Sequence, residues 1–143
     1  MNHTNKLEDF KVNVKIKLAA LWTSVMFCYI YEDYFELYVP KRLEHIISGD
    51  GLLNTPMMLF YASFVLIIPA LMIFLSIVSI PKLSRLLNII FGLLYTALML
   101  WIASNYSDKW LTFALLFAIV ESIITAIIVW CAWKWPRQNQ LKQ

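Results

Sequence analysis

The chain alternates between long apolar runs and shorter segments that carry most of its charged residues. A helix rises about 1.5 Å per residue, so about 20 consecutive apolar residues cross the hydrocarbon core of a bilayer. The clearest runs are residues 57–80, with no charged residue, and 111–133, with one; residues 86–103 form a shorter run. Thr55 and Pro56, before the first of these, are typical of a helix start. With a further span near the N-terminus, the pattern predicts an all-α membrane bundle of four transmembrane helices.

That N-terminal span, residues 18–38, is the least regular, because Glu32 and Asp33 interrupt it. A helix that ended at Tyr31 would be short for a membrane crossing. It would also place both acids beside its last carbonyls, where the helix dipole disfavours negative charge. We therefore extend the predicted helix to Tyr38 and expect Glu32 to lie on its solvated outer rim.

The four spans form one predicted transmembrane domain, residues 18–135, between polar tails at residues 1–17 and 136–143. Short turns at residues 81–85 and 105–110 join the last three helices, which predicts that these helices are sequential antiparallel neighbours. The only long loop, residues 39–54, has apolar residues at helical spacing. A short interfacial helix and a plain solvated loop are equally compatible with it.

Composition and charge agree with insertion into a lipid bilayer. Of the 143 residues 61% are hydrophobic, and the mean hydropathy of +0.68 exceeds that of ordinary soluble domains. Nine Lys and Arg fall on the side of the two termini, and three fall on the other side, Lys41, Arg42 and Lys109. The positive-inside rule then places both termini in the cytoplasm, in a multi-pass protein of the inner (cytoplasmic) membrane. The basic residues indicate orientation rather than nucleic-acid binding, and the polar N-terminal tail does not fit a cleaved signal peptide.

Glu121 is the single charged residue of the fourth run. A carboxyl group at the hydrocarbon midplane costs about 2.5–3.5 kcal/mol, so such a residue usually faces a bundle interior, a wet cavity or a partner. Thr125 lies on the same helical face, and small residues that favour close helix packing recur every fourth position nearby. These small residues are Ala114, Ala118, Ser122 and Ala126. We expect the carboxyl group to point into the bundle.

Residues at a similar depth in the other spans are candidate partners of Glu121. Counting from the helix ends places Tyr95 and Thr96 of the third span at this depth, together with Pro69 of the second. Pro69 also frees the carbonyl of Val65 near the midplane, because proline has no N–H to donate. A protonated Glu121 would donate a hydrogen bond to that carbonyl.

The first span adds a stripe of aromatic and acidic residues. Trp22, Tyr29 and Asp33 fall within one arc of the helix, and Asp33 lies in the outer part of the hydrocarbon layer. Together with the deeper Glu121, they would form a polar vestibule in the outer leaflet. Asn88, near the cytoplasmic end of the third span, is expected to bridge helices rather than to bind a ligand.

Motifs of enzymes and metal sites are absent from the sequence. It has no nucleophile elbow, phosphate-binding loop or zinc-protease motif, and both histidines lie outside the spans. Cys28 and Cys131 lack metal or redox spacing and are expected to be small apolar fillers. We therefore expect no metal, no cofactor and no enzyme. An integral enzyme acting on a lipid is the least favoured class.

Several residues of the first span match a family pattern. They are Leu21, Trp22, Val25, Phe27, Tyr29, Tyr31 and Asp33. This LWxxVxFxYxYxD run resembles the first-helix signature of an uncharacterised family, a domain of unknown function, of small bacterial four-helix membrane proteins. The similarity continues through Pro69, Glu121 and the tryptophans that end the fourth span. Many members have a further acid and an asparagine where this chain has Ile67 and Cys28, so the resemblance argues against a metal site.

Two roles remain open for such a protein in the lipid bilayer. The favoured one is binding or transport of a small lipophilic or cationic molecule in an intramembrane cavity, with Glu121 as a proton-exchanging carboxyl. The other is a structural or accessory subunit in which Glu121 forms hydrogen bonds between helices. Four helices leave little room for a pore, so transport would require a homodimer, and the accessory role requires a membrane protein partner. The candidate ligand or proton site comprises Glu121, Asp33, Tyr29, Trp22, Tyr95, Thr96, Thr125 and Pro69.

Overall fold

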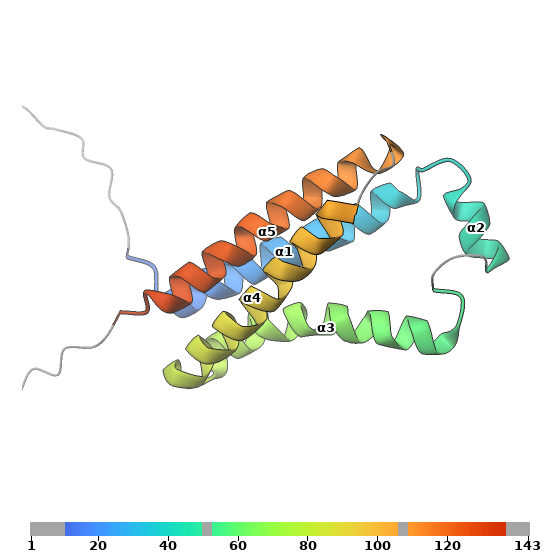
Figure 1. Ribbon diagram of the computed structural model, residues 1–143. Helices are drawn as coiled ribbons and strands as arrows, with labels where there is room; N and C mark the ends of the chain where they lie inside the picture. Colours follow the sequence, from blue (N-terminus) through green and yellow to red (C-terminus); the bar gives the residue numbers. More distant parts are fainter. Residues whose placement is uncertain (1–10, 50–52, 106–108, 137–143) are drawn as a thin grey trace, which may run out of the picture.

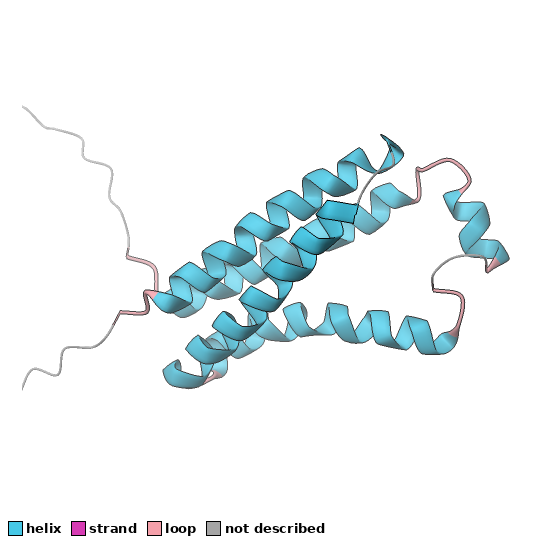
Figure 2. Cartoon of the chain, viewed as in Figure 1, coloured by secondary structure: helices cyan, strands magenta, loops and turns pink. Residues whose placement is uncertain are grey.

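A computed structural model of the protein describes residues 11–49, 53–105 and 109–136. Within these ranges all regular structure is helical, and no strand is found (Figure 2). The all-α class predicted from the sequence is therefore confirmed. The predicted tails lie outside the described residues at positions 1–10 and 137–143.

Four helices are long and apolar enough to cross a membrane. They are α1 (Val14–Glu36), α3 (Pro56–Val78), α4 (Pro81–Asn105) and α5 (Thr112–Trp133). Helix α1 begins four residues before the predicted start, because the Asn13 side chain caps it by accepting a hydrogen bond from the Lys15 amide at 2.9 Å. It ends two residues before the predicted Tyr38.

The boundaries of α3 and α4 follow from their prolines. The Thr55 hydroxyl accepts a hydrogen bond from the Met58 amide at 3.2 Å, and Pro56 is the first helical residue, as the sequence predicted. The predicted turn over residues 81–85 is wrong. Pro81 instead opens α4, because the fixed φ of proline suits the first helical position, and only Ser79 and Ile80 separate the two helices.

The long loop contains a short helix, α2 (Arg42–Ser48), so the helical alternative for this segment is correct. Gly49 ends α2 with a φ of 77°, a left-handed conformation that favours glycine. Arg42 forms an ion pair with Glu36 at the end of α1, which ties α2 to the bundle. A short 3₁₀ turn, η1 (Lys109–Leu111), leads into α5.

The helices alternate in direction, and the two ends of the described chain lie at the same end of the bundle (Figure 1). We call this the terminal end and the opposite one, near α2, the loop end. Helix α4 lies along α5, and α1 contacts both α3 and α5. Helices α3 and α4 meet at their short turn and diverge toward the loop end (Figure 1). The predicted neighbour relation therefore holds fully for α4 and α5 but only partly for α3 and α4.

The distribution of polar and apolar side chains suits a bilayer. Large apolar residues such as Phe27, Phe64, Leu93 and Ile123 are exposed on the outer faces of the helices. Polar residues are buried between the helices: Ser76, Ser84, Asn88, Glu121, Ser122 and Thr125. Lipid tails are as apolar as these outer faces, so polar contacts and close packing join membrane helices. With its four candidate spans, the chain is compatible with a membrane protein.

Asn88 is the centre of a buried polar network near the terminal end. Its Oδ1 accepts a hydrogen bond from the Trp22 indole at 2.8 Å, and its Nδ2 donates to the Ser84 carbonyl at 2.8 Å and to the Ser76 hydroxyl at 3.1 Å. The Ser84 hydroxyl donates to the Ser76 carbonyl at 3.1 Å. All four side chains are fully buried. The expectation that Asn88 bridges helices is confirmed, since the network joins α1, α3 and α4.

One turn along α4 from Asn88, Gly92 allows a close approach to α5. A Cβ atom at Gly92 would lie 2.7 Å from Cγ2 of Val129 and 3.4 Å from the Thr125 carbonyl oxygen. The first distance is shorter than carbon atoms tolerate, so only glycine fits without a shift of α5.

We expect Asn88→Ala to destabilise the bundle by about 1–2 kcal/mol, because it leaves the Trp22 indole N–H buried without its acceptor. Unfolding in mixed micelles measures this loss. Asn105→Ala is the matched control, since the same change at an exposed position of the same helix removes only local bonds to the Trp101 carbonyl and the Ser104 hydroxyl. Equal stability losses in the two variants would contradict the network's role.

Gly92→Ala is expected to cost about 1–3 kcal/mol, because the added methyl group overpacks the contact with Val129. Val129→Ala should reverse much of this loss when combined with Gly92→Ala, although it removes packing in the wild-type background. A double-mutant cycle on unfolding free energies measures the coupling. Simple additivity of the two changes would show that the close approach is not tight.

Candidate functional site

Most of the predicted site residues gather halfway along the bundle, where the polar side chains occupy two levels. In the level nearer the terminal end, every hydroxyl has a partner. The Tyr95 hydroxyl of α4 donates to the Val65 carbonyl of α3, which Pro69 leaves without its helical donor. The Thr96 hydroxyl donates to the Thr125 hydroxyl of α5 at 2.7 Å. Four predicted positions thus join α3, α4 and α5 through hydrogen bonds.

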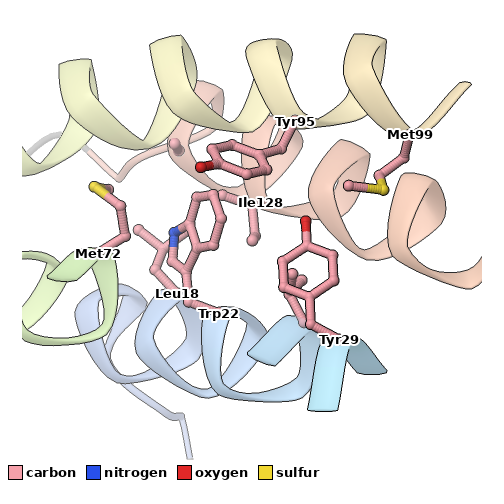
Figure 3. Packing of buried hydrophobic residues seen from close by; sticks show 9 residues of the cluster. Leu18, Trp22, Tyr29, Met72, Tyr95, Met99 and Ile128 are labelled. Carbon is pink, nitrogen blue, oxygen red and sulfur yellow. The ribbon is translucent and has the colours of Figure 1, made fainter. Parts of the chain in front are cut away.

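Trp22 closes this level on the side of α1. Its ring meets that of Tyr95 edge to face, with centroids 5.9 Å apart and planes at 87° (Figure 3). This geometry places the positive edge of one ring against the negative face of the other, which is favourable for aromatic pairs. Trp22 is completely buried, and its indole N–H is taken by Asn88. Trp22 is therefore a tightly packed boundary of the site, and its only polar atom already has a hydrogen-bond partner.

The free Val65 carbonyl was predicted correctly, but the prediction that Glu121 donates a hydrogen bond to it is wrong. Tyr95 donates the hydrogen bond in place of Glu121. Glu121 belongs to α5, which packs mainly on α1 and α4 and not on α3. The long tyrosine side chain of α4 reaches across to the α3 carbonyl, whereas the glutamate extends from a helix that does not pack on α3.

The second level, nearer the loop end, contains Glu121 and Tyr29, and here the polar atoms are unsatisfied. Glu121 has 0% of its surface exposed, and Tyr29 has 6%. Neither carboxylate oxygen of Glu121 forms a hydrogen bond with any described residue, and the same is true of the Tyr29 hydroxyl. The Tyr29 side chain extends from α1 into the bundle, toward α4 and α5 (Figure 3). Such unpaired buried groups are rare and need an explanation.

Thr125, which shares the helical face of Glu121, does not supply that missing hydrogen bond. Its hydroxyl lies 2.8 Å from the Glu121 backbone carbonyl and 3.1 Å from the Ser122 carbonyl, and it also accepts from Thr96. The Thr125 hydroxyl is therefore already occupied by other hydrogen bonds. The sequence correctly placed Glu121 in the bundle interior but did not show that it would lack a partner.

The strongest charges that act on Glu121 are those of two other acids on α1. Glu32 and Asp33 both interact with it electrostatically, and among the described residues no basic side chain forms an ion pair with it. Asp33 is exposed, whereas Glu121 is enclosed. Glu36, one turn farther along α1, is neutralised by Arg42. The arrangement is a negative region that runs from the surface near the loop end toward the buried Glu121.

Glu32 is the residue that the sequence interpretation undervalued. It projects to one side of the stripe formed by Trp22, Tyr29 and Asp33, so we expected it to lie on a solvated rim. In the structure it is half-buried and acts on Glu121, Tyr29 and Cys28. Its spacing of three residues from Tyr29 was the available signal, because residues three apart are neighbours on a helix.

The acids do not converge into a metal centre in the described part of the chain. No group of three or more His, Cys, Asp or Glu side chains there is arranged to hold a metal ion. The site instead combines one buried carboxyl group, the unpaired Tyr29 hydroxyl and two further acids on α1.

Comparison with known proteins yields one match. The model of a family described as a family of unknown function (DUF6326) matches residues 5–142, which include all four long helices. The expected similarity to an uncharacterised family is thereby confirmed. No curated protein and no solved structure matches the chain.

We expect Tyr95→Phe to destabilise the fold by about 1 kcal/mol, because it leaves the Val65 carbonyl without a hydrogen-bond donor in an apolar environment. The loss should shrink in a Pro69→Ala background, where the restored backbone N–H can donate to the same carbonyl. Unfolding of the two single variants and the double variant in micelles gives the coupling. An identical cost of Tyr95→Phe in both backgrounds would refute this account of the kink.

Proposed function

We propose that this chain, which belongs to the family of unknown function DUF6326, binds a small lipophilic cation between its helices and exchanges it for a proton on Glu121. Binding, or transport in a homodimer, follows from the same exchange. The proposal includes no catalytic step and no metal or cofactor.

One observation carries this proposal: both oxygens of Glu121 are fully buried and have no hydrogen-bond partner among the described residues. A carboxylate charge in such a place is costly unless a positive charge compensates it. The site therefore favours two states, one with a proton on the carboxyl and one with a cation beside it. A single group that accepts either a proton or a cation is the requirement for exchange.

The surroundings of Glu121 support a cationic ligand. Glu32 and Asp33 give the approach from the loop end a negative potential, which attracts cations and repels anions. Tyr29 offers an aromatic ring and an unpaired hydroxyl beside the carboxyl. Aromatic faces stabilise organic cations by about 0.5–2 kcal/mol. An aromatic or otherwise lipophilic cation combines these contacts with access through the bilayer.

The distribution of basic residues supports an orientation for this exchange. Among the described residues, those near the terminal end are Lys11, Lys15, Lys17, Lys82, Arg85 and Lys134, whereas Lys41, Arg42 and Lys109 lie near the loop end. By the positive-inside rule we propose that the terminal end is cytoplasmic, in the inner membrane, and that the acids face the outer side. Ligand and protons would then reach Glu121 from outside the cell.

The second candidate role, an accessory subunit, has one observation in its favour. The loop-end half of α3 diverges from α4 and exposes Phe60, Tyr61 and Phe64 (Figure 1). A helix of another membrane protein could pack there. A role for Glu121 in hydrogen bonds between helices of one chain lacks support, because its carboxyl has no partner in the described residues. In this second role the partner protein would have to supply the donor.

We expect binding of tetraphenylphosphonium, a lipophilic cation, to release protons from the wild-type protein in lipid nanodiscs. Apparent affinity should rise with pH, because fewer protons then compete for the same carboxyl. Glu121→Gln should weaken binding at least tenfold and abolish both the proton release and the pH dependence. Isothermal titration in buffers of different ionisation enthalpy measures affinity and proton release together.

Glu44→Gln is the matched control, since it makes the same change at an exposed residue of α2. This variant should keep the affinity, proton release and pH dependence of the wild type. Unchanged binding in Glu121→Gln, or binding without proton release, would refute the exchange. A Glu121→Gln variant that is only less stable, alongside a wild type that binds no cation, would favour the accessory role.

A further inference from the structure

The terminal end of the bundle contains a second site, far from Glu121 along the helices. A pocket of about 790 Å³ lies there between the segment before α1, the start of α4 and the residues that follow α5. Among the described residues that line it, four are basic and none is acidic. They are Lys11, Lys15, Lys82 and Arg85. Four like charges around one cavity repel each other unless an anion lies between them.

Two of these cations are held in place by the ends of neighbouring helices. The Lys15 ammonium donates to the Ile77 carbonyl at 3.0 Å and to the Ser79 carbonyl at 2.6 Å. The Arg85 guanidinium donates to the Ala132 carbonyl at 3.2 Å and to the Trp133 carbonyl at 3.4 Å. Both groups retain further N–H donors, because an ammonium and a guanidinium carry more hydrogens than these bonds use. Lys15 and Arg85 are therefore preorganised donors at the rim of the pocket.

The other two cations are free to move toward an incoming anion. Lys11 and Lys82 are exposed and form no hydrogen bond or ion pair with any described residue. Two fixed donors and two mobile ones suit a phosphate group, which offers several oxygens in different directions. The fixed guanidinium can bind two of those oxygens at once.

Apart from Asn13, the other described residues that line the pocket are apolar, which favours a lipid over a free phosphate ion. Val12 and Trp135 contribute side chains next to the basic groups. The pocket also lies where the candidate spans end, at the depth where lipid headgroups meet water. A headgroup can thus meet the cations while its glycerol and first acyl carbons lie against Val12 and Trp135.

We propose that this pocket binds the phosphate headgroup of an anionic phospholipid. The inference does not depend on the role of Glu121, which lies near the middle of α5 and interacts with other residues. A bound lipid would neutralise the basic cluster and connect the start of α1, the turn between α3 and α4, and the end of α5.

The test uses the full-length protein in detergent micelles with dioleoyl phosphatidylglycerol, dioleoyl phosphatidylcholine or soluble glycerol phosphate, and native mass spectrometry to measure binding. We expect the wild type to bind phosphatidylglycerol at least tenfold more tightly than phosphatidylcholine. The double variant Lys11→Gln, Lys82→Gln should lose about tenfold or more of the phosphatidylglycerol affinity, as expected for two basic contacts near a membrane surface. Both positions are exposed and cap no helix, and circular dichroism verifies the fold.

A second double variant, Lys17→Gln with Lys134→Gln, separates a specific pocket from general attraction. It removes the same charge at the same end of the bundle but outside the pocket lining. Its phosphatidylglycerol affinity should fall by no more than about twofold. Equal losses in the two double variants, or no preference for the anionic lipid, would overturn the proposal. Glycerol phosphate that binds as tightly as the lipid would also overturn it, by identifying a site for a soluble phosphate. Should the first double variant unfold, the single change Lys82→Gln carries the same comparison against Lys17→Gln.

Discussion

A hydrogen-bonding group buried between apolar helices must find its partner inside the bundle. The side chain of Asn88 connects buried polar groups of three helices. Its bonds to Trp22 and Ser76, together with the bond from the Ser84 hydroxyl to the Ser76 carbonyl, set the rotation and depth of α1, α3 and α4 relative to one another. A slip of any of these helices by one residue would leave several polar groups unpaired at once. The later contacts of α4 follow from this registration, because Gly92 then faces α5 and Tyr95 faces α3.

The buried polar side chains have hydrogen-bond partners at one end of the bundle and lack them toward the other. This difference separates the structural part of the bundle from its candidate functional part. From the turn between α3 and α4 to the pair of Thr96 and Thr125, the buried polar side chains form hydrogen bonds to neighbouring helices. One turn farther along α5, Glu121 and the nearby Tyr29 have none. Helices α3 and α4 also diverge toward this end (Figure 1). Proteins tolerate unpaired buried groups mainly where function requires them, so the unpaired groups make the loop-end half the candidate functional part.

The sequence was sufficient for features that depend on one helix at a time. Length and hydropathy identified the four spans, Thr55 and Pro56 identified a helix start, and Pro69 identified a freed carbonyl. Features that depend on which helices contact each other were harder to predict from the sequence. Counting residues gives the depth of Glu121 but not its direction around the helix bundle, so it was paired with Val65 when Tyr95 was the actual donor. Glu32 was assigned to the rim for the same reason, because its position on α1 does not show that α5 lies beside it. The hydrogen bonds that Lys15 and Arg85 form with other helices could be identified only from the tertiary structure.

Those two basic residues also bear on how the protein is made. Lys15 is synthesised more than sixty residues before the carbonyls of α3 that it caps, and Arg85 nearly fifty residues before those of α5. Each cap therefore forms only after the later helix has been synthesised and has returned to the terminal end. Because α3 precedes α5 along the chain, the cap from Lys15 can form at an earlier stage of synthesis than the cap from Arg85.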